Sequence, residues 1–342
     1  MPRQKITRTL KRFFLQSGIY GTLRRLYPNR SVSILRYHAV VEPEKNTYTT
    51  PTIAVSPKEF EAHVHYFSTH YRVLPLPEVV EALWNNFPLP ANCVVFTFDD
   101  GYADNLQAAR ILAKYQASGT FFLTTDPISR KEPFWLAEIT HLILTTPHRE
   151  LTVKLGSWEQ NFLLYNTRFR WKAIREVVRF IKSNNRATRE SIREQIRQQL
   201  CSGIESEAIL NLMLNWEQVR EMLALGMMVG SHTLTHLNLP NAEAEDARRE
   251  IEQSRKVLEE ELDREILHFS YPNSGPYPYF NKLIRAYVEE AGYKSSCTSE
   301  KGFAGRNSDL LALRRVRTVP QLEEVLHFME WDRVFSRNGT SP

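Results

Sequence analysis

Two adjacent carboxylates end a strongly apolar run of the sequence. The run Val94–Phe98 is followed at once by Asp99, Asp100 and Gly101. Such a run is typical of a buried strand, and side chains at the carboxyl end of a parallel strand point into the site that barrel folds use for catalysis. One carboxylate there can bind a metal while the other stays free as a base. Taken alone, the segment is equally compatible with an exposed Asp-Asp-Gly turn.

A pair of histidines four residues apart is the second chemical motif. His232 and His236 follow the apolar run Met227–Val229. This spacing suits a single metal ion if the intervening turn is helical or tightly curved, although paired histidines also occur on helix surfaces. Together with the strand-ending Asp-Asp pair the signal is much stronger. Asp100, His232 and His236 would supply three ligands and leave a position open for water, as in catalytic zinc sites.

The segments that must position these residues alternate between strand and helix patterns. Apolar, β-rich runs are separated by stretches with helical periodicity, which predicts parallel strands covered by helices in a barrel or a doubly wound sheet. The predicted strands are Ser33–Tyr37, Cys93–Phe98, Thr120–Leu123, Met227–Ser231, Leu267–Tyr271, Lys294–Cys297 and Leu313–Val319.

The pattern changes between residues 126 and 214, which predicts an insertion. A hairpin near residues 151–164 would precede two strongly charged helices around residues 168–183 and 188–200. The cations of these helices could bind an anionic substrate, but a charged helix face is usually solvated, and interspersed glutamates argue against a nucleic-acid partner. The predicted domains are an N-terminal segment (1–30), one barrel (31–125 and 215–320), a mainly helical insertion (126–214) and a C-terminal helix and tail (321–342).

The composition describes a globular protein with a large core. The 342-residue chain is 42% hydrophobic and 11% aromatic. No apolar run approaches the roughly 20 residues of a membrane-spanning helix. Cys93, Cys201 and Cys297 are odd in number and widely spaced, so they indicate neither a disulfide framework nor a cysteine zinc site. We therefore expect a soluble or peripheral protein.

The N-terminal segment is basic and amphipathic. Every charged side chain before Val41 is a cation, and the apolar stretch Phe13–Leu15 is too short and too interrupted for a secretory signal. The segment could therefore rest on an anionic membrane, or it could be an ordinary helix packed on the barrel. We expect a cytoplasmic protein with peripheral membrane contact as one option. The residues at helical spacing are Ile6, Leu10, Phe13, Ser17 and Tyr20.

Two segments resemble the signature motifs of a known family. Thr97–Tyr102 (TFDDGY) and Ser231–His236 (SHTLTH) resemble the first two motifs of the polysaccharide deacetylase family, the NodB-homology domain of carbohydrate esterases. The resemblance spans roughly residues 33–123 and 215–319 and implies a distorted seven-stranded (β/α) barrel. It also implies that Asp99 is the general base and that Asp100 and the two histidines hold a divalent cation. Zinc suits these ligands, although cobalt, nickel or manganese could replace it.

The later motifs are less regular. Phe269–Asn273 (FSYPN) resembles the Y-P-N variant of the third motif, with Ser270 where many members carry an arginine that orients the base. Leu313–Val316 (LRRV) resembles a later strand motif of such variants, so we predict that Arg315 takes this role, with Arg314 as the second candidate. Arginines at a strand end can equally be solvated.

Two histidines are candidates for the general acid. His38 ends the first predicted strand and resembles the Tyr-His pair of Y-P-N variants, whose histidine could protonate the leaving amine. His327, in Val325–His327, resembles a late L-x-H motif but falls in an amphipathic helical pattern. We favour His38 because a histidine at the carboxyl end of a strand faces the barrel mouth. Either could instead be a hydrogen-bonded core or surface residue.

The resemblance implies metal-dependent hydrolysis of N-acetyl groups. The cation would polarise the acetamide carbonyl, Asp99 would accept the proton of the attacking water, and His38 would protonate the amine. The expected substrate is an N-acetylhexosamine-containing polysaccharide or a lipid-linked glycan intermediate; the sequence does not indicate the oligomeric state. Residues predicted to contact the sugar are Tyr102, Trp135, Trp216, Tyr271, Pro272 and Asn273.

Two other functions remain open from the sequence. The same metal site could remove O-acetyl groups or open a cyclic amide, because the ligands do not select the acyl substrate. The chain could also be an inactive carbohydrate-binding module on the same barrel. Release of acetate from N-acetylated but not O-acetylated sugars would separate these alternatives from N-deacetylation.

Overall fold

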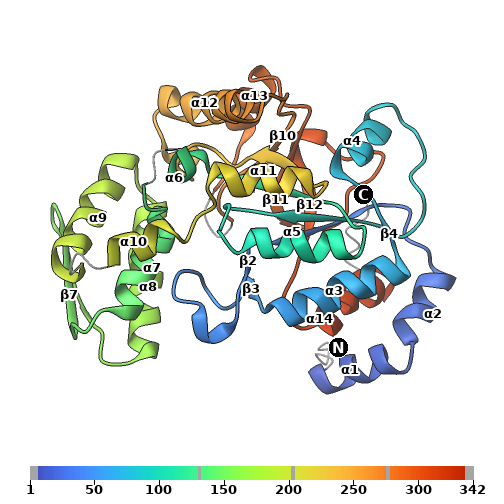
Figure 1. The fold of residues 1–342 in the computed structure, drawn as a ribbon, viewed down its shortest axis with the longest axis horizontal. Helices are drawn as coiled ribbons and strands as arrows, with labels where there is room; N and C mark the ends of the chain where they lie inside the picture. The colour runs from blue at the N-terminus through green and yellow to red at the C-terminus, as the bar shows by residue number, and fades with distance from the viewer. Residues whose placement is uncertain (1–6, 130–131, 202–204, 275–277, 336–342) are drawn as a thin grey trace.

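Seven parallel strands close into a barrel (Figure 1). The computed structural model describes residues 7–129, 132–201, 205–274 and 278–335. Around the ring the order is β1, β12, β11, β10, β9, β6 and β5, and β5 pairs back with β1. The predicted seven-stranded barrel is thus confirmed. The strands are β1 (Ser33–Tyr37), β5 (Cys93–Phe98), β6 (Gly119–Leu123), β9 (Met228–Ser231), β10 (His268–Ser270), β11 (Ser295–Lys301) and β12 (Leu313–Arg317).

The inward-facing side chains differ between the two ends of the barrel. They are apolar at the floor, where the strands begin, and polar at the mouth, where the strands end. Successive residues of a strand point to opposite faces, so every second residue faces inward. In β12 the inward series runs from Leu313 to Arg315 and Arg317, while in β5 Val95 precedes Thr97. Leu313 and Val95 belong to one apolar cluster that also contains α4 (Leu76–Trp84), which closes the floor. Charged inward residues are therefore confined to the carboxyl ends of the strands.

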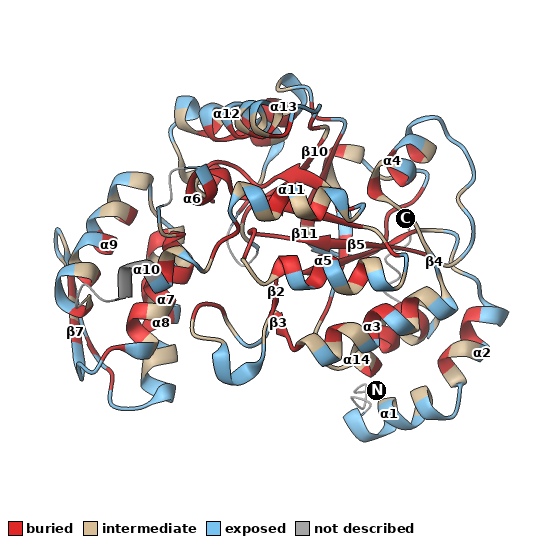
Figure 2. Cartoon of the chain, viewed as in Figure 1, coloured by how far each residue is buried: buried red, intermediate tan, exposed pale blue. Residues whose placement is uncertain are grey.

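Helices cover the outside of the barrel and bury one apolar face each (Figure 2). Their starts are specified locally: Ser56 and Glu59 form a capping box at α3, and Asn215 and Gln218 form another at α11. The short strand β4 (Arg72–Val73) pairs with the first residues of β5 outside the closed ring. The covering helices are α3 (Pro57–His70), α5 (Asn105–Lys114), α11 (Trp216–Ala224), α12 (Ala244–Leu262) and α13 (Lys282–Glu290).

Short elements line the barrel mouth and connect the larger ones. β2 and β3 form a two-residue parallel ladder, which encloses the loop 41–53. This ladder and β4 were not predicted, because two-residue strands carry no readable periodicity. The short elements are β2 (Ala39–Val40), η1 (Pro43–Lys45), β3 (Ala54–Val55), α6 (Thr125–Ser129), η2 (Leu239–Asn241) and η3 (Leu310–Ala312).

The insertion is a separate lobe beside the barrel mouth, on the left of Figure 1. It contains the predicted hairpin and the two predicted charged helices. Glu138 is buried and accepts hydrogen bonds from Arg193 and Arg197, which ties the first helix of the lobe to α9. Its apolar core extends into the barrel residues Ala39 and Tyr102, so the lobe is packed on the barrel. Its elements are α7 (Trp135–Thr145), β7 (Glu150–Leu155), β8 (Trp158–Leu163), α8 (Thr167–Lys182), α9 (Arg186–Leu200) and α10 (Glu205–Leu210).

The N-terminal helices pack against the C-terminal helices. Tyr20 is fully buried and its hydroxyl lies 3.2 Å from Nδ1 of His327, while Phe14 stacks on Trp331. The predicted single amphipathic face is therefore divided: Tyr20 packs on the core, whereas Leu10 and Phe13 are exposed, and Ile6 lies outside the described residues. The helices are α1 (Arg8–Gln16), α2 (Ile19–Leu26), α14 (Leu322–Leu326), η4 (His327–Asp332) and α15 (Arg333–Phe335).

Among the described residues, no helix has the length and apolar character needed to cross a bilayer.

Candidate metal and catalytic centre

Three buried side chains converge at the barrel mouth in a geometry that fits one metal ion. Nε2 of His232 lies 3.5 Å and Nε2 of His236 lies 3.4 Å from Oδ1 of Asp100. The three ligand atoms all lie within 4.8 Å of one another. Atoms bound at 2.0–2.1 Å to one tetrahedral ion lie about 3.4 Å apart. The predicted triad is therefore assembled, and the two separations from Asp100 agree with this spacing.

The protein fixes the tautomer of one imidazole. Nδ1 of His232 lies 2.7 Å from the carbonyl oxygen of Ser270. A carbonyl oxygen can only accept, so Nδ1 carries the proton and Nε2 presents its lone pair toward Asp100. Such outer hydrogen bonds orient metal-binding histidines and strengthen them as ligands. The ring of His236 is held instead by packing against Phe134, with ring centroids 5.4 Å apart.

The backbone adopts uncommon conformations where these ligands are presented. Asp100, Thr233 and His236 have φ angles of 80°, 69° and 57°, in the left-handed region that non-glycine residues rarely occupy. Gly101 follows at φ 90°, and a Cβ there would lie 3.2 Å from the side chain of Leu123. The tight turn after β5 therefore requires glycine. Left-handed residues clustered in this way are a feature of functional sites.

Insertion and barrel jointly clamp the loop that carries the histidines. Arg189 of α9 donates to the carbonyl and hydroxyl oxygens of Thr235. The backbone N–H and hydroxyl of the same threonine donate to Glu250 of α12 at 2.8 and 2.6 Å. Thr235 lies between the two histidines in sequence, so these contacts fix the curved turn that brings both imidazoles to one point.

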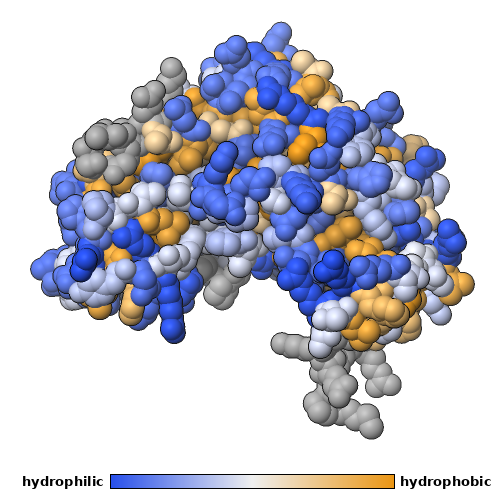
Figure 3. All heavy atoms as spheres, turned by 60° about the horizontal axis from the view of Figure 1, so that its bottom comes forward, coloured by the Kyte–Doolittle hydropathy of each residue, from blue (hydrophilic) through white to orange (hydrophobic). Residues whose placement is uncertain are grey.

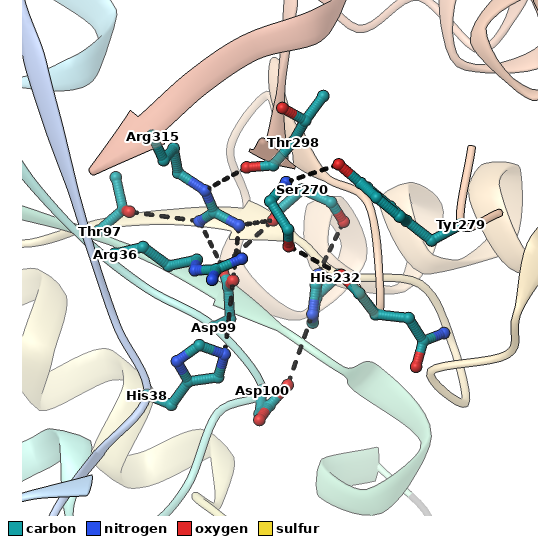
Figure 4. A network of polar contacts seen from close by, with 12 residues as sticks. Arg36, His38, Thr97, Asp99, Asp100, His232, Ser270, Tyr279, Thr298 and Arg315 are labelled. Atoms are coloured by element: carbon teal, nitrogen blue, oxygen red, sulfur yellow. Dashed lines mark hydrogen bonds and ion pairs between the residues drawn. The ribbon is translucent and has the colours of Figure 1, made fainter. Parts of the chain in front are cut away.

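Arg315 holds Asp99 in a bidentate ion pair (Figure 4). The two guanidinium nitrogens donate to Oδ1 and Oδ2 at 2.8 and 2.7 Å. Ser270 accepts from Arg315 at 3.0 Å and donates to Asp99 at 3.2 Å, while Nε of Arg315 donates to the carbonyl of Thr298. The small side chain at position 270 leaves room for an arginine that arrives from β12. Arg314, the second candidate, points away and pairs with Glu300.

The ion pair keeps Asp99 ionised. Burial alone would raise its pKa, but Arg315, with smaller contributions from His232 and His38, holds the pKa of this carboxyl well below its ordinary range. Burial likewise opposes ionisation of Asp100, yet His232 and His236 lower its pKa. Asp99 is thus a carboxylate at neutral pH and able to accept a proton.

His38 lies at the same mouth. Its Nε2 is 4.0 Å from Oδ2 of Asp99, and its side chain is 15% exposed. Burial lowers the pKa of His38 to about 4, although Asp100 and Asp99 oppose that shift. The imidazole is therefore neutral at physiological pH. His327, the alternative, lies instead against Tyr20 among the C-terminal helices and is not among the residues lining the pocket.

Metal ligands, Asp99 and His38 open into one pocket. Its lining also includes Arg36, Asn273 and Arg317 from strand ends, and Thr49, Thr50, Thr52 and Ile53 from the loop between β2 and β3. The insertion supplies the remaining wall. The carbonyl of Lys182 accepts hydrogen bonds from Asn238 and Asn241, so the end of α8 is attached directly behind the histidine loop. The insertion residues lining the pocket are Leu136, Thr140, Ile174, Arg175, Val178 and Lys182.

Several residues predicted to contact the sugar do not line the pocket. Tyr102 and Tyr271 are fully buried, and the hydroxyl of Tyr271 donates to the carbonyl of Leu311. Pro272 is buried beside it, and Trp216 packs from α11 against the core. Trp135 lies behind His236, with its ring 6.3 Å from the imidazole. Of the predicted contacts, Asn273 alone is among the residues that line the pocket. Most aromatic residues in a barrel of this size pack in the core, and the spacing of a motif does not show which ones reach the surface.

Some pocket residues carry no motif in the sequence. In the sequence, Arg36 is recognisable only as one of the N-terminal cations. In the structure it lies two residues before His38 on the inward face of β1. That alternation could have identified it. Lys182 and Arg175 lie on a helix whose polar residues are nearly all cationic, so their direction toward the pocket could not be inferred from charge pattern.

Comparisons with known proteins match the part of the chain that carries both motifs. The family model described as "Polysaccharide deacetylase" matches residues 87–296. The putative polysaccharide deacetylase YxkH of Bacillus subtilis is 24% identical over 289 residues, which cover 84% of this chain and 71% of that protein.

Solved structures share the fold at low identity. The deacetylase PplD of Streptococcus pyogenes, in complex with acetate, has a TM-score of 0.56 and 22% identity, covering 88% of this chain and 98% of that one. IcaB of Ammonifex degensii has a TM-score of 0.54 and 17% identity, covering 87% and 97%. The family match spans more than half of the sequence and contains the Asp-Asp and His-x-x-x-His motifs around which the site is built. The chain therefore belongs to the polysaccharide deacetylase family.

Proposed function

We propose that this deacetylase removes N-acetyl groups from N-acetylhexosamine residues in a metal-dependent reaction. The observation that carries the proposal is the juxtaposition of a buried Asp100–His232–His236 triad with an ionised Asp99 that is not part of the triad. A divalent cation bound there, zinc by ligand preference, would polarise the acetyl carbonyl and acidify water. The rest of the chemistry falls to side chains of the pocket.

Asp99 accepts a proton as water attacks the acetyl carbon. Arg315 keeps the carboxylate ionised and fixes its orientation through two hydrogen bonds, so the accepting oxygen is held in place. The new C–O bond forms as the proton leaves water. Breaking of the C–N bond then requires a proton on the departing nitrogen.

His38 delivers that proton. It is neutral before reaction, and its Nε2 lies 4.0 Å from Oδ2 of Asp99. One bridging water spans this separation, so the proton taken by Asp99 passes through that water and the imidazole to the sugar nitrogen. The products are acetate and a free amine. This relay leaves Asp99 and His38 in their starting states, as turnover requires.

A test of the reaction compares two acyl linkages on otherwise similar sugars. Purified zinc-loaded protein is given N-acetylglucosamine oligomers and O-acetylated sugars, and acetate is measured enzymatically. Acetate from the amide alone supports the proposal. Acetate from the ester alone would identify an O-deacetylase, and acetate from neither, with intact sugar binding, would indicate a binding module. Ring opening of a cyclic amide substrate is the third comparison.

We further propose that the N-terminal helices contact an anionic membrane surface, which would suit a lipid-linked glycan intermediate at the cytoplasmic face. Leu10, Phe13 and Leu26 are 40%, 55% and 67% exposed, and the exposed cations Arg12 and Arg25 lie on the same helices. Figure 3 shows hydrophobic side chains gathered on this face of the molecule. Such a surface combines apolar contact with attraction to anionic lipids.

Liposome co-sedimentation tests the membrane contact. The full chain should sediment with vesicles that contain anionic lipid and stay in solution with neutral ones. The Phe13→Ser variant, which changes a largely exposed residue, should lose at least half of the bound fraction. Equal sedimentation of both proteins with both vesicles would contradict the proposal.

A further inference from the structure

One buried cation in the pocket has no ion-pair partner among the described residues. Arg36 is 8% exposed, its Nε makes no hydrogen bond, and no ion pair joins its guanidinium to any residue in the described part of the chain. A guanidinium withdrawn from water without a counter-charge is costly. Its one acidic neighbour, Asp99, is already bound through both oxygens by Arg315. Figure 4 shows Arg36 beside this ion pair at the barrel mouth.

A second arginine stands next to Arg36 on the same face of the barrel. Arg36 and Arg317 are register partners in the β1–β12 ladder, so their side chains project to the same side. Both line the pocket, and Arg317 is tied to the loop beyond β2 by a hydrogen bond to the carbonyl of Thr52 at 3.1 Å. Like charges directly opposite in a sheet are destabilising unless an anion lies between them.

The whole pocket shows the same imbalance of charge. Its described lining contains four cations besides the histidines, namely Arg36, Arg317, Arg175 and Lys182, against the carboxylates Asp99 and Asp100. Asp99 is neutralised by Arg315, and Asp100 is a candidate metal ligand. Burial lowers the pKa of Arg36 to about 10, and the positive charge of Arg315 adds to the shift. This direction agrees with a cation that lacks its counter-charge.

We propose that Arg36 and Arg317 form an anion subsite beside the catalytic centre, and that the preferred substrate is an N-acetylated sugar carrying a phosphate or carboxylate group. This inference rests on the proposed deacetylase function and names its substrate class. A planar guanidinium can bind either group through paired, charge-assisted hydrogen bonds. The loop residues Thr50 and Thr52 line the same side of the pocket and add hydroxyl groups.

Matched sugars test the subsite. Acetate release by the zinc-loaded full chain is compared for N-acetylglucosamine, N-acetylglucosamine 6-phosphate, N-acetylglucosamine 1-phosphate and N-acetylmuramic acid. We expect kcat/KM to be at least about tenfold higher for one or more charged sugars, the size of one charge-assisted hydrogen bond. The phosphate and carboxylate arms then show which group is preferred. Equal values for charged and neutral sugars would overturn the subsite while leaving the deacetylase function intact.

Arginine variants test whether the subsite causes the preference for charged sugars. Arg36→Gln and Arg317→Gln should each lower the ratio of kcat/KM for charged over neutral sugar by about tenfold. Arg317 is exposed, so its variant remains informative if the buried Arg36 variant fails to fold. Arg314→Gln is the matched control, because Arg314 lies on the same strand but pairs with Glu300 outside the pocket. An unchanged ratio in both variants would contradict the assignment.

Measuring sugar binding without turnover distinguishes a missing anion subsite from a missing deacetylase reaction. In the zinc-loaded Asp99→Asn protein, calorimetry should show tighter binding of the charged sugars than of N-acetylglucosamine, and Arg36→Gln in that background should remove the difference. If this pattern appears without acetate release by the unaltered protein, the anion subsite stands and the proposed reaction fails. If no charged sugar binds more tightly, the subsite is refuted.

Discussion

The two sides of the pocket are built in different ways. On the barrel side, Asp99, Asp100 and Arg315 stand at strand ends and are held by specific hydrogen bonds and ion pairs. On the insertion side, α8 presents the apolar Ile174 and Val178 beside cations. It is attached by apolar packing and by a backbone carbonyl that accepts a hydrogen bond from Asn238. Changes to these three barrel residues should therefore affect kcat, whereas changes to the insertion wall should affect KM.

This contrast explains what short motifs can encode. A metal site and a base need fixed atoms within a few ångströms, and strand ends of a closed barrel provide them from a few residues. The insertion forms a wall of the pocket, for which only overall shape and charge matter. Many different sequences can supply these.

Asp99→Asn should give the largest loss. Removing the proton acceptor should lower kcat by about 10² to 10⁴, the usual contribution of a general base. Metal content should stay unchanged, because Asp99 is not among the triad. Steady-state kinetics with metal analysis measures both. Full turnover by this variant would remove Asp99 from the proposed mechanism.

His38→Gln should lower kcat by about 10² at neutral pH because protonation of the leaving amine slows. The pKa of His38 is about 4, so its charge should not change between pH 8 and pH 6. A pH profile of kcat/KM in the unaltered protein should accordingly show no acid limb near pH 6.5 from this residue. The matched control is His327→Gln, which should retain activity; the reverse order of effects would favour His327.

Arg315→Lys should lower activity roughly tenfold to a hundredfold, since one ammonium cannot reproduce the bidentate contact. The variant should also move the acid limb of the pH profile. Arg315 holds the pKa of Asp99 below its ordinary value, so weakening the pair raises that pKa and activity is lost at a higher pH than in the unaltered protein. An acid limb that stays in place would show that Arg315 acts only in folding.

Lys182→Met should raise KM by about tenfold and leave kcat within about twofold, if this lysine contacts the substrate through one charge-assisted hydrogen bond. Lys172→Met is the control, since Lys172 is 65% exposed on the same helix and pairs with Glu176. A loss in kcat with unchanged KM would mean that the insertion takes part in the chemical step, and the contrast between the two sides would fail.

Much of the fold and the centre of the site could be predicted from the sequence. The strands were recognisable because parallel strands buried on both faces leave continuous apolar runs, and the Asp-Asp and His-x-x-x-His groups interrupt those runs with charge. Arg315 could be proposed because Ser270 left the base without its usual partner. The geometry brings Arg315 and Asp99 together as expected.

The remainder depends on tertiary packing that no local pattern encodes. Tyr102 is predicted to contact the sugar, but the left-handed turn directs it into the core beside Tyr48, with ring centroids 5.2 Å apart. The burial of Tyr20 against His327 likewise joins segments 307 residues apart. Contacts over such separations decide which side of a helix is covered.

Metal dependence is tested by measuring acetate release from N-acetylglucosamine oligomers before chelation, after chelation and after zinc is restored, in parallel with Asp100→Ala. We predict that chelation abolishes activity, that zinc restores it in the unaltered protein, and that Asp100→Ala stays inactive with reduced zinc content. Undiminished activity in the chelated protein, or in an Asp100→Ala variant without zinc, would contradict a metal centre built on Asp100, His232 and His236.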